Sequence, residues 1–276
     1  MIQWPDDPIA QFFAKDVPKG TMSLLNGIVL FVGAMMAGLM NSVAGGGSFF
    51  SFPALIFTGV PPIPANATST VAIWPGSVAA IGAYWRKLPR RAAIMLPLTA
   101  SSVVGGLLGA LILLRTPQAT FMRLVPYLFL VATLLFAFGR KLSQGVGAWI
   151  NNRSASSWLM VSGAALVQLV IAVYGGFFGG GIGILMLALL SMVQMGDIHS
   201  MNAVKSLLAA AINGVAVVTF IVAGVVVWPQ ALLMIVGAAL GGYGGAHFAQ
   251  KLDPRLVRGF VIAVGFSMTI YFLWKY

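Results

Sequence analysis

The sequence predicts an all-α integral membrane protein made of two inverted repeats, each with four long transmembrane helices and one short half-helix after a triple glycine. Three observations carry this prediction. Of the 276 residues, 59% are hydrophobic and 8% are charged, whereas about 25% of the residues in soluble domains are charged. The charges gather in short clusters between long uncharged stretches. Landmarks of the first half also recur in order in the second.

The composition excludes several classes of function. So few charges exclude an ordinary soluble enzyme and a disordered chain. The chain has no Cys, two His and five acidic residues, all Asp, so we expect no catalytic residues, no metal site and no cofactor. The net charge of +11 would suggest nucleic acid in a soluble protein, but basic residues also mark the cytoplasmic loops of membrane proteins. We therefore expect the lipid bilayer as a partner and no nucleic acid.

Residues 1–20 form the predicted N-terminal tail. Asp6, Asp7 and Asp16 lie among prolines there, and the stretch lacks the basic start and apolar core of a signal peptide. A solvated tail and an interfacial position for 9–14 both remain open.

Eight segments are apolar over about 20 residues, the length that a helix needs to cross a bilayer. Their expected ranges are 21–43, 66–85, 91–114, 118–139, 157–178, 200–223, 228–250 and 255–274. Two further apolar segments, 48–59 and 182–195, are only about 12–14 residues long. That length is typical of a half-helix or a re-entrant piece. Each of the two follows three consecutive glycines.

Four landmarks of the first half recur in the second at a shift of about 134–136 residues. They are the triple glycines at 45–47 and 179–181, the polar runs at 65–70 and 201–206, the glycine clusters at 105–109 and 241–245, and the Pro-Arg turns at 116–123 and 253–258. We therefore divide the chain into repeat 1 at 21–139, an inter-repeat loop at 140–156 and repeat 2 at 157–276.

The basic residues of equivalent loops distinguish inverted from parallel repeats. The loop at 86–91 carries four basic residues, whereas its counterpart at 223–227 carries none. In the next loop the bias reverses: repeat 1 has Arg115 and Arg123, and repeat 2 has Lys251, Arg255 and Arg258. Because basic residues favour the cytoplasmic side, this reversal predicts inverted repeats with both termini outside. If the short segments only re-enter the membrane, the halves are parallel.

The two triple glycines are the predicted substrate site. Three glycines break a helix, and the short helix that follows exposes free N–H groups and the positive end of its dipole, which favour an anion. Broken helices at a repeat interface mark the sites of many transporters. The candidate substrate-binding residues are Gly45, Gly46, Gly47, Ser48, Asn66, Ser69, Thr70, Gly179, Gly180, Gly181, Asn202, Lys205 and Ser206. Close helix packing is the alternative explanation for glycine-rich segments.

Lys205 is the one basic residue well inside an apolar stretch. A Lys at the centre of a membrane helix costs about 2.5–3.5 kcal/mol on insertion scales, so such residues are functional by default. Contact with the anion and snorkelling to the headgroups both remain open for this side chain. Asp197 and His199 are expected in a solvated loop just before it.

An ordered series of motifs runs through about 21–275. In the first half it consists of Ala44–Gly47, Pro53, Gly59–Pro62 and Asn66–Ser69. In the second half it consists of Phe178–Gly181, Asn202–Leu208, Asn213, Trp228–Pro229 and Gly241–Ala246. This series resembles the sulfite exporter TauE/SafE family. The resemblance implies a multi-pass permease of the bacterial inner membrane for small sulfur-containing anions, namely sulfite, sulfonates such as sulfoacetate, or thiosulfate.

We therefore expect a transporter and not an enzyme. Its partner would be a small inorganic or organic sulfur oxyanion, exported by alternating access around a midplane site at the two glycine breaks. An anion channel that uses the same site is the alternative. The sequence leaves the oligomeric state open, with a homodimer among the alternatives.

Overall fold

The computed structural model describes residues 22–43, 46–84, 88, 92–150, 157–193, 198–248 and 254–276. The helices of the first half are α2 (Leu24–Val43), α3 (Ser48–Phe57), α4 (Pro62–Tyr84), α5 (Ala92–Arg115) and α6 (Gln118–Ile150). Those of the second half are α7 (Ser157–Phe177), α8 (Ile182–Met192), α9 (Ile198–Val222), α10 (Trp228–Phe248) and α11 (Pro254–Lys275). The described residues form no strand, so the all-helical prediction is confirmed.

The helix lengths follow the predicted order of one long, one short and three long helices in each half. One boundary differs, because α6 continues to Ile150 and so into the segment 140–156 that was expected to be a loop. This extension contains basic and polar residues but no proline. Charge ends a membrane span without ending a helix, since a helix satisfies its own backbone hydrogen bonds in water as well as in lipid.

Five of the described helices are long and apolar enough to cross a membrane. Their apolar windows are Leu24–Asn41, Ala93–Arg115, Gln118–Phe138, Met160–Phe177 and Ser200–Val222. The sequence predicts eight such helices. The five are counted over the described residues alone, and α4, α10 and α11 are not among them. α3 and α8 are shorter apolar helices, as predicted.

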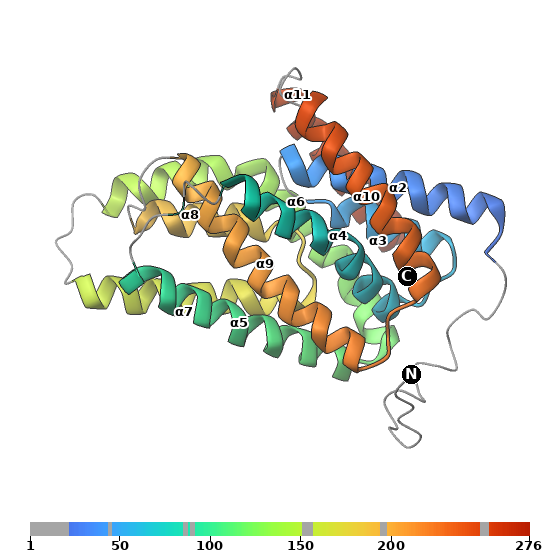
Figure 1. Cartoon of the computed structure of the whole chain (residues 1–276), viewed down its shortest axis with the longest axis horizontal. Helices are drawn as coiled ribbons and strands as arrows, with labels where there is room; N and C mark the ends of the chain where they lie inside the picture. Colours follow the sequence, from blue (N-terminus) through green and yellow to red (C-terminus); the bar gives the residue numbers. More distant parts are fainter. Residues whose placement is uncertain are drawn as a thin grey trace.

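The long helices pack mainly across the two halves. α2 lies along α10, α5 lies along α7, and α4 packs against α9 (Figure 1). In the order of the two halves, α2 corresponds to α7, α4 to α9 and α5 to α10. Under this correspondence the α2–α10 pair is equivalent to the α7–α5 pair, and the α4–α9 pair is equivalent to itself. Neither half therefore has a separate core.

Glycines allow the closest of these approaches. A Cβ at Gly109 of α5 would overlap Val173 O of α7, and a Cβ at Gly241 of α10 would overlap Met35 O of α2. Small residues at such contacts let helix backbones approach closely, which is a common basis of helix association in membranes. The glycine clusters that recur in the sequence are therefore packing surfaces.

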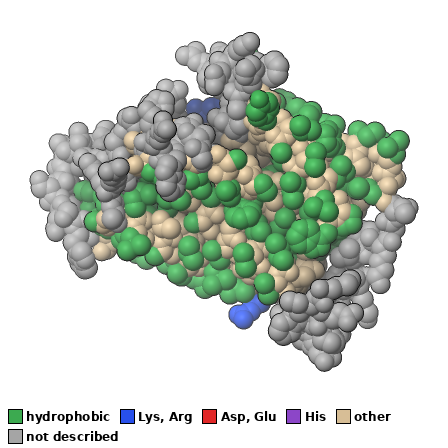
Figure 2. Space-filling view, viewed as in Figure 1, with side chains coloured by type: hydrophobic (Ala, Val, Ile, Leu, Met, Phe, Trp, Pro, Cys, Tyr) green, Lys and Arg blue, Asp and Glu red, His purple; other side chains and the backbone are tan. Residues whose placement is uncertain are grey.

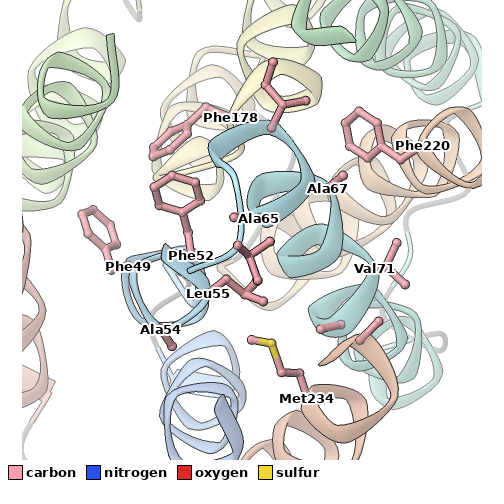
Figure 3. Close-up of a cluster of buried hydrophobic side chains, with 14 of the residues drawn as sticks. Phe49, Phe52, Ala54, Leu55, Ala65, Ala67, Val71, Phe178, Phe220 and Met234 are labelled. Atoms are coloured by element: carbon pink, nitrogen blue, oxygen red, sulfur yellow. The ribbon is translucent and has the colours of Figure 1, made fainter. Parts of the chain in front are cut away.

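Aromatic side chains form the centre of the core around α3. Phe52 is fully buried, and its ring lies 6.1 Å from that of Phe178 and 6.0 Å from that of Phe129. Phe49 meets the Phe129 ring edge-on at 5.4 Å. Figure 3 shows Phe49, Phe52 and Phe178 gathered beside the short helix. This cluster places α3, α6 and the second glycine break against one another.

The outer surface is apolar where long helices face outward. Leu166, Val170 and Val222 each expose 65% or more of their surface. Figure 2 shows hydrophobic side chains spread over the visible face, with Lys or Arg side chains at its margins. Such a surface is suited to lipid, because exposed apolar patches of this extent are rare on soluble monomers.

Candidate functional site

The first glycine break joins α2 to α3. Gly46 has φ +94, and α3 begins at Ser48 directly after Gly47. The Gly47 N–H donates to Asn41 Oδ1 at 2.9 Å, so a side chain of α2 already occupies the N-terminus of the short helix. A Cβ at Gly46 would lie 2.9 Å from Phe136 Cζ. Gly45 lies outside the described residues.

Two hydroxyl groups bind each other near the same end of α3. Ser51 Oγ and Ser69 Oγ are 2.6 Å apart, and both side chains are buried. Ser51 also donates to Gly47 O at 3.2 Å. Ser48, in the first turn of α3, is 9% exposed. The predicted residues of the first break are therefore together, but their polar groups largely bind one another.

The second break joins α7 to α8 and is built differently. The Phe178 and Gly179 N–H groups donate back to Tyr174 O, at 2.9 and 3.3 Å. Gly179 has φ +82 and Gly181 has φ +76, a left-handed conformation that favours glycine. α8 begins at Ile182, and no side chain of the described residues caps it.

The N-terminus of α8 retains free donors. Within the described part of the chain, the N–H groups of Gly180, Gly181, Ile182 and Gly183 make no hydrogen bond. The first three of these residues are buried. Buried N–H groups are rarely left without a partner, and helix N-termini bind anions through such groups. The arrangement is therefore suited to an anion.

Lys205 of α9 lies beside this helix end. Its Cδ is 3.4 Å from the place that a Cβ of Gly183 would occupy, and its Nζ donates to Asn202 Oδ1 at 3.0 Å. None of the five Asp residues falls in the described part of the chain, so the ammonium has no carboxylate partner there. An ammonium beside the positive end of a helix dipole raises the local positive potential.

Asn66 and the two remaining predicted hydroxyls lie on α4 and α9. Asn66 Nδ2 donates to Phe177 O at 3.1 Å, which ties α4 to the end of α7 just before the second break. Thr70 donates to Asn66 O and Ser206 to Asn202 O, each at 2.9 Å and one turn back along its own helix. Both hydroxyl hydrogens are used within their own helices, so these oxygens can accept a hydrogen bond but have no hydrogen left to donate to an anion.

α6 brings the two breaks together. A Cβ at Gly46 would meet Phe136 of α6, and a Cβ at Gly180 would lie 3.3 Å from Ala132 Cβ of the same helix. Residues four apart on a helix are separated by about 6 Å along its axis. Both breaks therefore lie against a single turn of α6.

Two surface cavities lie elsewhere. One of about 470 Å³ runs between α5 and α7, lined by residues that include Pro97, Ser101 and Leu169. The other, of about 490 Å³, includes Val60, Gln118 and Arg123. Neither is lined by a glycine of the breaks. The glycine breaks therefore line neither of these two cavities.

Sequence analysis missed three residues of the site. Asn41, which accepts the Gly47 N–H just before α3, is a polar side chain within an apolar helix, and that position alone could have marked it. Gly183 follows the second triple glycine by two residues and makes room for Lys205. Tyr174 has a buried hydroxyl without a partner among the described residues. Asp197 lies outside the described residues, and so does the His199 side chain.

Comparisons with known proteins agree with the resemblance. A family model described as sulfite exporter TauE/SafE matches residues 30–272. A protein of a Sinorhizobium species is 30% identical over 242 residues, which cover 87% of this chain and 90% of that protein. A protein of Haemophilus influenzae is 27% identical over 242 residues, with 87% and 92% covered. One from Escherichia coli K12 is 28% identical over 247 residues, with 89% and 88% covered.

All three relatives are described as probable membrane transporter proteins. No solved structure matches the chain. The family model spans most of the described helices, from α2 to α11. The chain therefore belongs to the sulfite exporter TauE/SafE family of membrane transporters.

Proposed function

We propose that the chain is a secondary transporter that exports a small sulfur-containing anion across the bacterial inner membrane by alternating access. The anion is sulfite, a sulfonate such as sulfoacetate, or thiosulfate, the class that the family description suggests. The site lies where the two glycine breaks meet on α6. The bacterial relatives support the location.

One observation carries the proposal, namely the N-terminus of α8 with Lys205 beside it. The free N–H groups of 180–183 supply directed donors, and the ammonium supplies charge. Tetrahedral or pyramidal oxyanions accept several hydrogen bonds at once, and hydrogen bonds to charged groups are stronger than neutral ones. No carboxylate of the described residues competes for these donors.

We further propose that the two halves are inverted repeats. The α2–α10 and α7–α5 pairs are equivalent between the halves, as expected for two related halves around one axis. The reversal of basic residues between equivalent loops supports opposite orientations in the membrane. Inverted halves around a shared site are a common plan among secondary transporters.

The carrier mechanism is favoured over a channel by the closed surroundings of the breaks. Aromatic rings cover the first break, and the second is buried against Ala132. A channel needs a continuous wet path, whereas a carrier passes through states in which its site is enclosed.

Flux measurements on the purified chain in proteoliposomes test the proposal. The panel consists of sulfite, thiosulfate, sulfoacetate, sulfate and acetate. We expect saturable flux of at least one sulfur anion, and loss of that flux when Gly180 is replaced by Leu. Ohmic, non-saturating current would contradict the carrier mechanism. Unchanged flux in Gly46→Leu and Gly180→Leu would contradict the site.

A further inference from the structure

The two glycine breaks occupy equivalent places in the repeats, but their side chains differ. Gly47 and Gly181 are the last glycines of the two triplets and directly precede α3 and α8. Counting back six residues from each gives Asn41 in α2 and Gly175 in α7. The positions that follow the breaks can be compared in the same way.

In the first half, Asn41 acts as an internal ligand. Its side-chain oxygen accepts the Gly47 N–H at 2.9 Å. An oxygen of a bound anion would occupy the same kind of place at a helix N-terminus. The protein therefore fills this end of α3 with one of its own neutral oxygens.

In the second half, the equivalent position is a glycine and has no side chain that could do the same. A Cβ at Gly175 would lie 3.0 Å from Ile212 Cγ2 and 3.3 Å from Ile182 Cδ1. A side chain here would therefore press on both isoleucines. The N–H groups at the start of α8 make no hydrogen bond within the described part.

The position on the following helix differs in charge. At the shift of 136 residues that relates the polar runs, Ser69 of α4 corresponds to Lys205 of α9. Ser69 forms a neutral pair with Ser51 of α3 at 2.6 Å. Lys205 instead places a cation beside Gly183 of α8. The same position is thus neutral in one half and cationic in the other.

We infer that the anion site is asymmetric: one anion binds per chain at the N-terminus of α8 with Lys205, and Asn41 with the Ser51–Ser69 pair closes the first break as a built-in substitute for a ligand. This inference rests on the proposed transport function for its ligand. It reassigns Ser69 from substrate contact to closure of α3. It also makes Asn41 a positioning residue that holds the first break without touching the anion.

Binding measurements test which half holds the anion. The purified full chain is titrated with sulfite, thiosulfate and sulfoacetate by calorimetry. We expect Lys205→Gln to raise the Kd about tenfold or more, because a charge-assisted hydrogen bond is lost, and Lys205→Arg to restore most of the affinity. Asn41→Ala and Ser51→Ala should lower the melting temperature but change the Kd by less than about twofold. If either raises the Kd as much as Lys205→Gln does, the asymmetry is wrong.

Cysteine reactivity provides a second test that needs no substrate. The chain has no Cys, so Ser48→Cys and Gly183→Cys each carry a single thiol at the first turn of a short helix. We expect an anionic sulfonatoethyl methanethiosulfonate to modify position 183 faster than a cationic trimethylammonium analogue does, and Lys205→Gln to remove that preference. Position 48 should react slowly with both reagents.

The outcomes separate the two proposals. If the wild type binds none of the anions while position 183 still prefers the anionic reagent, the assigned substrate class is wrong and the asymmetry holds. Equal reactivity at positions 48 and 183, or no reaction at either, would overturn the asymmetry whatever the anion panel shows.

Discussion

Single residues tie the two halves together through buried hydrogen bonds. Thr68 of α4 is fully buried, and its Oγ1 accepts the Val227 N–H at 3.0 Å. Trp74 Nε1 of the same helix donates to Ala210 O of α9 at 3.1 Å. Each of these bonds satisfies a group that is otherwise difficult to hydrate, so the residues of α4 specify how the second half docks.

Replacing Thr68 by Val removes this acceptor at nearly constant volume. The Val227 N–H would then be buried without a partner, which costs about 1–3 kcal/mol. We expect a clearly lower melting temperature in detergent for Thr68→Val. Thr116→Val is the matched control, because Thr116 is only partly buried and its hydroxyl donates to Ile112 O of α5, the helix that ends just before it. Equal melting temperatures for the two variants would show that the Thr68 bond has no net effect.

Sequence reasoning identified Lys205 but not Asn41, for a physical reason. A lysine in an apolar stretch is costly wherever it points, so its presence alone indicates function. An asparagine can be satisfied by one nearby backbone N–H, and only the fold shows that Gly47 supplies it. The triple glycines likewise show in the sequence where a helix breaks. Whether the N–H groups at the start of α3 or α8 have a partner depends on residues in other parts of the chain.

Glycines position the helices of two pairs, α5 with α7 and α2 with α10. Gly105 and Gly109 of α5 meet the backbone of α7, and Gly38 and Gly241 serve the α2–α10 pair. In membranes there is little hydrophobic force between helices, so such close contacts supply much of the attraction.

A methyl group at this surface should separate α5 from α7. Gly109→Ala places a Cβ where Val173 O and Gly176 C already lie, and overpacking of this kind typically costs about 1–3 kcal/mol. We expect a lower melting temperature and reduced transport. Gly163→Ala serves as the control on α7, because a Cβ there meets nothing within 4 Å. Because Ala has a higher helix propensity than Gly, the control should be at least as stable as the wild type. A stability loss of the same size in the control would contradict the packing explanation.

At the level of elements, the sequence was a good guide to helices and a poor guide to their ends and partners. The triple glycines correctly predicted where α3 and α8 begin, because no helix continues easily through three glycines. The apolar segment 118–139 predicts the span but not the end of α6, which continues as a helix to Ile150. Hydrophobic segments of this kind also resemble one another, so the sequence contains no sign that α2 packs against α10.

The whole molecule makes a topological prediction that labelling can test. If the repeats are inverted, the loop at 86–91 faces the cytoplasm and the equivalent loop at 223–227 faces the outside. We expect a membrane-impermeant maleimide to label Ala223→Cys in intact cells, and Leu88→Cys only after the membrane is opened. The absence of native Cys makes the two variants directly comparable. Labelling of both positions from one side would establish parallel halves.

The pairing of α2 with α10 also determines when this helix pair can form during synthesis of the chain. About 200 residues separate these two helices in the chain, and synthesis at ~5–20 residues per second takes roughly 10–40 s to cover that distance. Throughout this time the glycine face of α2 has no partner and must wait in the lipid or against the insertion machinery. α5 meets α7 after a much shorter interval. The nascent chain therefore completes one side of the molecule early, and the other only when its last helices emerge.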